Sequence, residues 1–447
     1  FCGYNRALNR YLMTAIHCFE RINSSIMTQP SFSNFAAGVT TETAFDVLSI
    51  AKQLKAAGKR VIELEIGDSP FPSTQNGVDA GIKAIQDDMC HYGPSNGIPE
   101  FRQAVADYVN SEYGLSVGPE NVVAGPGAKI FEQLFCEAFI NEGDGVLVFS
   151  PFFPTYPPNI NRRGGRIWYS ELTQENEFRP NLDDVAKFLE EDPNPRAIFI
   201  NTPHNPTGGV TTLEDLQGLA DLVRGKDVAV FADEPYDQMA WSGQHHTLLA
   251  QEGMLDQCVA CYTFSKSFSM SGWRLGYAVS SEANINMISK LINTTLSCVP
   301  PFVQMAGAAA LNGDRSQRDE YMGIFETKVK YLAEQLDALD GVKCLVPGGT
   351  FYVFPNVAEI CNRHGITSHG LAMYLLTDAD EDFGVACLGG ECFGDAGHGF
   401  LRFSTAEPDE LIQEALDFLP GAFNADEKIT EFVTANPKYK LESPYSV

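Results

Sequence analysis

The chain alternates short apolar runs with segments of helical spacing between residues 121 and 264, and this alternation constrains the fold more than any other feature. The apolar runs are residues 121–127, 145–150, 166–171, 197–201, 228–233 and 258–264. Between them, apolar residues recur at the spacing of amphipathic helices. Strands that are apolar throughout are typical of parallel sheets buried on both faces. We therefore expect an α/β fold whose mostly parallel sheet is covered by helices on both sides.

A second, smaller region flanks these runs in the sequence. Residues 45–60 have helical spacing and end near Gly58, and residues 61–67 alternate as a strand does. Beyond residue 312, residues 319–340 predict one long helix. Strand-like segments follow at residues 343–357, 383–394 and 399–406. They predict a small antiparallel-type sheet with helices around it, and hence a second, α+β domain.

A chain of 447 residues is long enough for two domains. The expected parts are a leader or arm (1–44), the N-terminal part of the small domain (45–75), the large domain (76–311), the rest of the small domain (312–420) and a loosely ordered tail (421–447). Residues 1–26 contain an apolar stretch that is too short to span a bilayer. Three explanations stay open for them: residues not native to the mature chain, a flexible arm, or an organelle transit peptide.

The chain is strongly acidic, with 31 Lys and Arg against 58 Asp and Glu, a formal charge of -27. Nucleic acids and anionic membranes bind to basic surfaces, so we expect neither as a partner. The 11 cysteines lack the dense, regular spacing of a disulfide scaffold, which indicates a reducing compartment and favours a cytoplasmic location. Cys258 and Cys261 form a CxxC pair inside an apolar run, but no second pair completes a zinc site. We expect no metal.

Residues 262–276, YTFSKSFSMSGWRLG, contain the main candidate for chemistry. Lys266 stands among small and hydroxylated residues, and its apolar neighbours can partly desolvate it, which suits a Schiff-base lysine. Arg274, eight positions later, has the rigid fork of donors that binds an anion such as a phosphate. The alternative is an ordinary solvated lysine on the surface.

Residues 264–277, FSKSFSMSGWRLGY, resemble the lysine segment of the class I and II aminotransferases, which are pyridoxal-phosphate enzymes of fold type I. Further segments match the same family in the same order and extend the resemblance over about residues 45 to 415. The resemblance implies a large domain with a mostly parallel, seven-stranded-type sheet and a smaller α+β domain. It also implies that Lys266 holds pyridoxal 5′-phosphate as an aldimine and, once free, moves a proton between substrate and cofactor.

A strand-to-helix turn at residues 125–127 places the amides of Ala128 and Lys129 at a helix N-terminus, which suits a phosphate. A turn without a ligand is the alternative, but the turn resembles the family's phosphate loop, and this match includes Gly127. The resemblance adds three further phosphate ligands, Thr263, Ser265 and Arg274. At the first of these positions the family usually has serine or glycine, and threonine keeps a hydroxyl group there.

Two turns after strands carry candidates for holding the cofactor ring. Phe153, in SPFFPTYP, matches the aromatic residue that stacks on the ring in the family, a task that needs only a π-surface. Packing in the core is the alternative. Asn205, in the rigid turn TPHNPTGG, matches the asparagine that binds the cofactor's phenolic oxygen. Turn formation by an asparagine is the alternative explanation.

Asp233 ends a wholly apolar strand, where a carboxylate is costly unless it is paired. A protonated ring nitrogen is such a partner, and the ion pair would keep the cofactor an electron sink. Tyr236, three residues later, would reach the phenolic oxygen beside Asn205. The competing explanation is a metal held by Asp233 and Glu234, but no histidine or further carboxylate cluster accompanies them.

Arg402, in a strand-like segment of the second domain, matches the family's clamp for the substrate α-carboxylate. A structural ion pair is the alternative. Gly67 resembles the family's backbone contact to the same carboxylate, although its neighbours depart from the commoner glycine-acid-proline-acid pattern. The resemblance also gives Asn205 a place beside the substrate.

Tyr92 and Ser297 match residues that, in this family, reach across a dimer interface to the neighbour's phosphate. The resemblance therefore implies a homodimer in which each chain completes its neighbour's cofactor site. Ordinary loop positions are the alternative for both residues.

These matches predict an aminotransferase of amino-acid metabolism that moves an amino group between an L-amino acid and a 2-oxo acid. One alternative is a pyridoxal-phosphate lyase or another enzyme of the same fold, which eliminates, decarboxylates or cyclises. Another is a cofactor-binding transcription regulator, which needs a basic DNA-binding domain that this acidic chain does not favour. The amino donor and acceptor are not predicted, because Arg162, Arg163 and Arg166 resemble no clamp for a second carboxylate.

Overall fold

The computed structural model describes residues 30–39 and 42–446. It divides the chain into two units, residues 1–40 and 41–447. In the first unit, α2 (Asn34–Gly38) is a short helix whose first turn is capped by the Ser33 side chain. The expectations for residues 1–26 lie outside the described residues.

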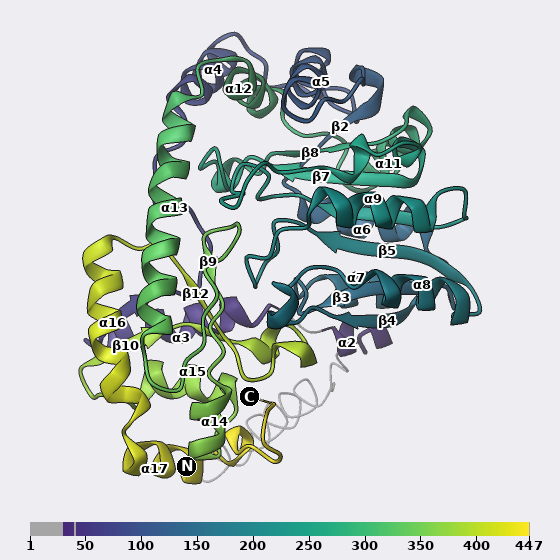
Figure 1. Ribbon diagram of the computed structural model, residues 1–447. Helices are drawn as coiled ribbons and strands as arrows, with labels where there is room; N and C mark the ends of the chain where they lie inside the picture. Colours follow the sequence, from purple (N-terminus) through teal and green to yellow (C-terminus); the bar gives the residue numbers. More distant parts are fainter. Residues whose placement is uncertain (1–29, 40–41, 447) are drawn as a thin grey trace, which may run out of the picture. The chain divides into compact units, whose positions relative to one another are not determined.

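A seven-stranded sheet organises residues 41–447 (Figure 1), in the order β2-β8-β7-β6-β5-β3-β4. Its strands are β2 (Val122–Gly125), β3 (Gly145–Ser150), β4 (Arg166–Glu171), β5 (Pro195–Asn201), β6 (Ala229–Asp233), β7 (Cys258–Thr263) and β8 (Gly276–Val279). The pairs on the β7-to-β4 side are parallel, and β8 is antiparallel to both β2 and β7. The predicted mostly parallel sheet is confirmed.

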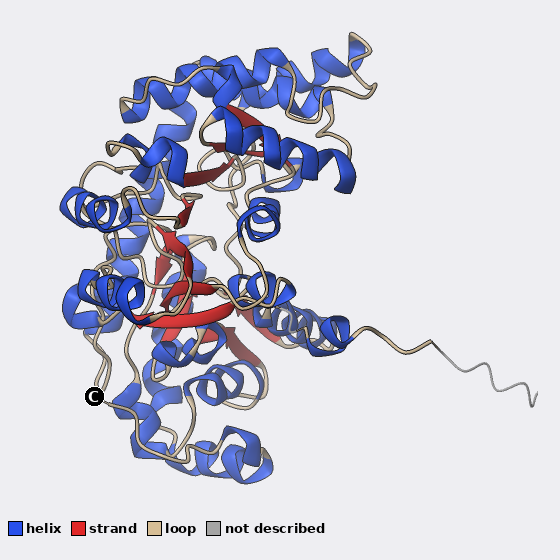
Figure 2. Ribbon diagram, turned by 90° about the vertical axis from the view of Figure 1, so that its right-hand side faces the viewer, coloured by secondary structure: helices blue, strands red, loops and turns tan. Residues whose placement is uncertain are grey.

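Helices cover both faces of this sheet, as Figure 2 shows. Residues in its strands alternate between two hydrophobic cores: in β3, Leu147 and Phe149 belong to one, and Val146 and Val148 to the other. The helices of the first core include α4 (Gln75–Gln86), α5 (Pro99–Tyr113), α8 (Leu182–Glu191), α9 (Leu213–Val223), α10 (Met254–Gln257) and α12 (Pro301–Asn312). Those of the second are α6 (Lys129–Phe139), α7 (Tyr156–Arg162) and α11 (Glu282–Thr295).

Two small sheets accompany the large one, and the first of them joins the start of this unit to its end. The first pairs β1 (Arg60–Glu63) in parallel with β10 (Phe383–Ala386). The second is antiparallel, in the order β11-β12-β9, and its strands are β9 (Tyr352–Val353), β11 (Leu388–Gly389) and β12 (Leu401–Ser404). The helices near them are α3 (Thr43–Ala56), α13 (Ser316–Asp337), α14 (Ala358–His364), α15 (Ser368–Thr377), α16 (Asp409–Phe423) and α17 (Asp426–Ala435).

Helix α13 is the predicted long helix, and in Figure 1 it runs from the neighbourhood of α12 towards the small sheets. The expectation of a loosely ordered end is wrong for residues 421–446. Ile429 and Phe432, one turn apart on α17, are buried, and the Tyr445 hydroxyl donates to Glu391. These few residues hold the segment in place. The expectation failed because the composition of the segment is mostly polar. The predicted domain boundaries stay predictions.

Among the described residues, no helix combines the length and the apolar character that crossing a membrane requires.

Candidate active site

A cavity of about 370 Å³ opens where the strands of the large sheet meet the small sheets. Asp233 and Thr263, at the ends of β6 and β7, line it from one side, and Arg402, from β12, lines it from the other. The carboxyl ends of parallel strands are the usual place for a ligand in such sheets. The predicted site residues that line the cavity are Gly67, Ala128, Lys129, Phe153, Asn205, Asp233, Tyr236, Thr263, Ser265, Lys266, Arg274 and Arg402.

Lys266 lies in the loop that leads from β7 back to β8, and its side chain is half-buried. Its amine donates a hydrogen bond to the carbonyl of Gly67 at 2.6 Å. The same nitrogen lies 5.6 Å from the ring centroid of Tyr236 and 5.4 Å from that of Phe351. The amine therefore sits between two aromatic faces, held by a hydrogen bond that another partner can replace.

Asp233 is buried at the end of β6 and accepts two hydrogen bonds. The donors are the hydroxyl of Tyr156, at 2.5 Å, and the thiol of Cys261, at 3.2 Å. Burial raises the pKa of the Asp233 carboxyl to about 6, although both donors lower it. A cationic partner in the cavity would favour the ionised form. The sequence analysis missed Tyr156, whose position one turn after Phe153 was the available signal.

Arg402 is buried on β12 and is held by two acceptors. One guanidinium nitrogen donates to the side-chain oxygen of Asn205 at 2.9 Å, and another donates to the main-chain carbonyl of Glu65 at 2.6 Å. The guanidinium carbon lies 4.2 Å from the ring centroid of Tyr352 and 5.0 Å from that of Phe393. These contacts fix a planar cation at the cavity wall, the arrangement that suits a carboxylate ligand.

Gly67 lies where a side chain has no room. A Cβ atom at this position would be 1.7 Å from the hydroxyl oxygen of Tyr352. The same hydroxyl is the partner of the Tyr236 hydroxyl, at 3.3 Å. Burial raises the pKa of Tyr236 well above its usual range, so the phenol stays protonated and able to donate. Tyr352 was also missed, because no motif marks the two-residue strand that carries it.

The predicted phosphate ligands gather at the N-terminus of α6. Gly127 has φ +88°, and a Cβ there would lie 2.6 Å from a guanidinium nitrogen of Arg274, so the close approach requires glycine. Arg274 is exposed and donates to the carbonyls of Ser271, at 2.8 Å, and Pro126, at 3.2 Å. Thr263 donates to Ser265 at 3.0 Å. Gly127 itself is not among the described residues that line the cavity.

Phe153 and Lys129 form one wall of the cavity. The Phe153 ring packs edge-on against Tyr156 with centroids 5.9 Å apart, and the Lys129 amine lies 5.2 Å from the Phe153 centroid. Lys129 also forms an ion pair with Glu42. Below them, Glu132 is buried and accepts a hydrogen bond from Thr155 at 2.5 Å.

The carboxyl group of Glu132 was not predicted as part of the site. Burial and the nearby Asp233 raise its pKa well above the usual range. This wall of the cavity therefore contains a neutral acid.

Glu234 points away from Asp233. Its carboxylate accepts hydrogen bonds from His245 and Thr247, each at 2.8 Å. Within the described part of the chain, no cluster of three metal-ligand side chains occurs. The two neighbouring carboxyl groups thus have separate partners, and their geometry does not support the competing metal site.

Tyr92 and Ser297 are not brought to the cavity. The Tyr92 side chain is 91% exposed, and Ser297 is exposed with φ 67°. Arg162, Arg163 and Arg166 are likewise not among the described residues that line the cavity. Among the described residues, the arginines that line the cavity are Arg402 and Arg274, and the second of these is the predicted phosphate ligand.

Comparisons with known proteins agree with this arrangement. The family model described as aminotransferase class I and II matches residues 59–419. An aspartate aminotransferase of Bacillus sp. (strain YM-2) is 31% identical over 388 residues, which cover 86% of this chain and 97% of that protein. The aromatic-amino-acid aminotransferase 2 of Thermococcus litoralis is 30% identical over 363 residues, which cover 80% of this chain and 90% of that protein.

Solved structures of the same kind share the fold. The aspartate aminotransferase of Thermus thermophilus with maleate aligns with a TM-score of 0.82 and 27% identity, covering 88% of this chain and 100% of that one. The alanine aminotransferase of Pyrococcus furiosus aligns with a TM-score of 0.80 and 27% identity, covering 88% and 99%. The family model and the relatives, which cover most of the chain, show that the chain belongs to the class I and II aminotransferases and that it is an enzyme that transfers amino groups.

Proposed function

We propose that this aminotransferase uses pyridoxal 5′-phosphate and that Lys266 is its catalytic lysine. The observation that carries the proposal is the position of the Lys266 amine, inside the cavity and on a hydrogen bond to Gly67. The two aromatic rings and the hydrogen bond hold the amine at one place in the cavity, where a bound aldehyde could reach it. No other described lysine that lines the cavity has this setting, because Lys129 is paired with Glu42.

The donor set of the cavity fits a phosphorylated pyridine aldehyde. Burial raises the pKa of the Asp233 carboxyl group to about 6, because the ionised form loses its contact with water. A protonated ring nitrogen would provide a compensating positive charge. Arg274 and the α6 N-terminus offer donors to a phosphate. Phe153 offers an aromatic face to the ring. When bound, this cofactor supplies an electron-withdrawing ring that makes the substrate's Cα–H acidic.

The remaining residues bind the substrate and handle its proton. Arg402, held by Asn205 and the Glu65 carbonyl, binds the α-carboxylate of the amino acid and so orients its Cα–H bond. The Lys266 amine would then move the proton from Cα of the donor to the cofactor, and in the second half of the reaction it would move a proton back from the cofactor to Cα of the acceptor. Tyr236, protonated at neutral pH, and Asn205 donate to the phenolic oxygen.

We infer that the functional unit is a homodimer to which Tyr92 and Ser297 contribute across the interface. Two observations support this. The Tyr92 ring is almost fully exposed, and Ile82 and Ile85, on α4, are 51% and 52% exposed. Isoleucines three residues apart share one face of a helix, and an apolar face next to an exposed tyrosine is typical of an interaction surface. The cytoplasmic location stays a prediction from the cysteine pattern.

The test of the proposed function uses Lys266→Ala. Purified wild type should be yellow, and borohydride reduction followed by peptide mapping should find the cofactor on Lys266. The variant should lose turnover of every amino acid and keto acid pair by more than about a hundredfold, because the proton carrier is gone. Lys187→Ala, which removes an exposed lysine of α8, should keep full activity. Colourless wild type that ignores added cofactor would refute the proposal.

A panel of amino acids separates transfer from the alternative chemistry. Under transfer, each active donor should bleach the cofactor colour and yield its keto acid, and a keto-acid acceptor should appear as an amino acid. Ammonia with pyruvate, formed without an acceptor, would instead identify an eliminating enzyme. The same panel ranks the acidic, aromatic and small aliphatic donors, which the relatives' names leave equally open.

A further inference from the structure

Glu65 is a buried carboxyl group that the proposed chemistry does not use. We propose that Glu65 is a positioning residue for Arg402, and that it takes up a proton when a carboxylate ligand binds to that arginine. The inference rests on the proposed function in one respect, the role of Arg402 in binding the substrate carboxylate. It goes further because it couples binding of the substrate carboxylate to protonation of Glu65.

The main chain around Glu65 is fixed on both sides. The Leu64 amide donates to Ala386 at 2.9 Å, and the Leu64 carbonyl accepts from Ser404 at 2.8 Å, so this segment lies between β10 and β12. These hydrogen bonds hold the main chain of the next residue, Glu65, close to Arg402 on β12. Its main-chain carbonyl already accepts a hydrogen bond from the guanidinium at 2.6 Å.

The side chains of Glu65 and Arg402 each leave a polar group without a partner. Glu65 is fully buried and lines the cavity, and neither of its carboxyl oxygens has a hydrogen-bond partner among the described residues. The Nε of Arg402, 4% exposed, also lacks one. A buried carboxylate without a partner is costly unless the acid is neutral, and a buried guanidinium N–H without one is available to a ligand.

The charges around Glu65 determine its protonation. Burial is the main cause that raises the pKa of its carboxyl group to about 7, and the carboxylates of Glu63, on β1, and Glu407, after β12, raise it further, whereas the main-chain N–H of Glu65 itself lowers it. Arg402 lowers it. The thiol of Cys387, between β10 and β11, faces it as a neutral group, because burial raises the pKa of this thiol well above its usual range. Near neutral pH, the group therefore responds to a change in charge at Arg402.

A ligand carboxylate makes such a change. While the site is free, the positive charge of Arg402 favours ionised Glu65. The negative charge of a bound carboxylate offsets the positive charge of Arg402, so Glu65 is more easily protonated. By reciprocity, protonation of Glu65 must strengthen carboxylate binding by the same factor. A neutral Glu65 leaves the guanidinium to the ligand, whereas an ionised one competes for it.

The test measures protons rather than turnover. Holoenzyme is titrated calorimetrically at pH 7 with the unreactive carboxylates maleate and 3-phenylpropanoate, in phosphate and in Tris buffer, and the difference in heat gives the protons taken up. Wild type should take up a fraction of a proton per ligand, and its affinity should fall about five- to tenfold between pH 6 and pH 8. The Glu65→Gln variant should still bind both carboxylates. It should no longer take up a proton on binding, and its affinity should depend less on pH.

Two comparisons make the result decisive. Glu137→Gln, on α6 and outside the cavity, should behave as wild type. Thermal unfolding of Glu65→Gln should be cooperative, which excludes misfolding as the cause of a changed heat. Equal proton uptake in wild type and Glu65→Gln would refute the role of Glu65 and leave the proposed function intact. No binding of either carboxylate to yellow, active wild type would refute both this inference and the role of Arg402.

Discussion

Ionisation of the buried Asp233 carboxyl group lowers the stability of the folded protein. Its two donors, Tyr156 and Cys261, hold the side chain in place, but burial still keeps its pKa near 6, above its usual value of 3.8. A folded-state pKa that is raised for an acid means that ionising the group opposes folding. This loss of folding stability is absent below pH 3.8, grows between pH 3.8 and about 6, and is complete above about pH 6.

Asp233→Asn should therefore stabilise the cofactor-free protein at pH 8. The expected gain is about 1–3 kcal/mol, because an amide carries no charge to desolvate. Urea unfolding of cofactor-free protein measures it, and the gain should be smaller at pH 5 than at pH 8. Asp107→Asn, an exposed position on α5, is the control and should change little. In the loaded enzyme the same change should weaken cofactor binding. A destabilised variant at pH 8 would show that Asp233 already has a sufficient partner.

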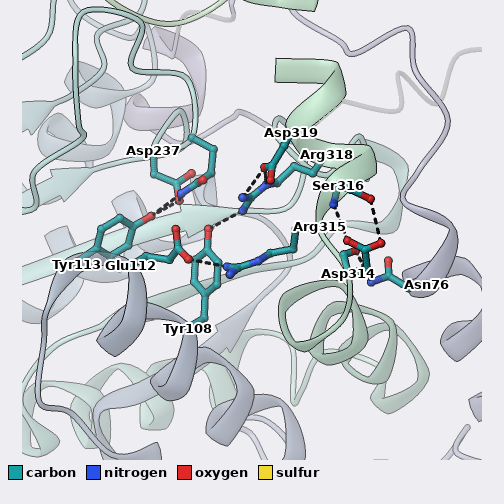
Figure 3. A network of polar contacts seen from close by, with 11 residues as sticks. Asn76, Tyr108, Glu112, Tyr113, Asp237, Asp314, Arg315, Ser316, Arg318 and Asp319 are labelled. Atoms are coloured by element: carbon teal, nitrogen blue, oxygen red, sulfur yellow. Dashed lines mark hydrogen bonds and ion pairs between the residues drawn. The ribbon is translucent and has the colours of Figure 1, made fainter. Parts of the chain in front are cut away.

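At the scale of elements, a network of polar contacts joins α5, the start of α13 and Asp237, in the segment after β6 (Figure 3). Arg318, buried near the start of α13, donates to Tyr108 of α5 at 3.2 Å, and its guanidinium lies 5.6 Å from the ring centroid of Phe268. Tyr113, at the end of α5, donates to Asp237, the residue after Tyr236. Helices α5 and α13 thus contact both segments that bring the proposed catalytic residues, Lys266 and Tyr236, to the cavity.

Two arginines of this network should differ in their effect on stability. Arg318→Ala should cost about 2–3 kcal/mol, because it leaves the buried Tyr108 hydroxyl without this partner and removes packing on Phe268. Arg315→Ala removes a partly exposed pair with Glu112 and should cost less than about 1 kcal/mol. Urea midpoints, read with unchanged slopes, measure both. Similar losses for the two variants would show that burial is not what makes Arg318 important.

Elements and site residues were predictable from the sequence wherever local pattern decides them. The period of residues 319–340 located α13, and residues directly after strands, such as Asp233 and Asn205, reached the cavity because strand ends meet there. Strand β8 was not predicted, since its four residues follow a loop without a strand's period. Tyr352 and Glu65 were missed as site residues for another reason: their contacts, to Tyr236 and to Arg402, join segments that lie far apart in the sequence.

At the scale of the whole molecule, the cavity is built from one chain, yet two predicted phosphate ligands lie outside it. Tyr92 and Ser297 are exposed, whereas Arg274, Thr263 and Ser265 line the cavity. If the exposed pair serves a neighbour, cofactor retention depends on assembly. A dimer then links protein concentration to cofactor content, because binding of the partner stabilises the loaded state.

The dimer prediction is tested with Ile82→Glu combined with Ile85→Glu. A charge at each isoleucine of α4 should disfavour burial of that face, so sedimentation should show monomers where wild type is dimeric, and the monomers should lose cofactor on dialysis. Ile324→Glu, at an exposed isoleucine of α13, is the matched control and should stay dimeric and yellow.

Tyr92→Phe should stay dimeric but release cofactor about tenfold more readily, because one hydrogen bond to a charged phosphate is lost. Wild type that sediments as a monomer while yellow and active would contradict the prediction, since a complete site would then need no second chain.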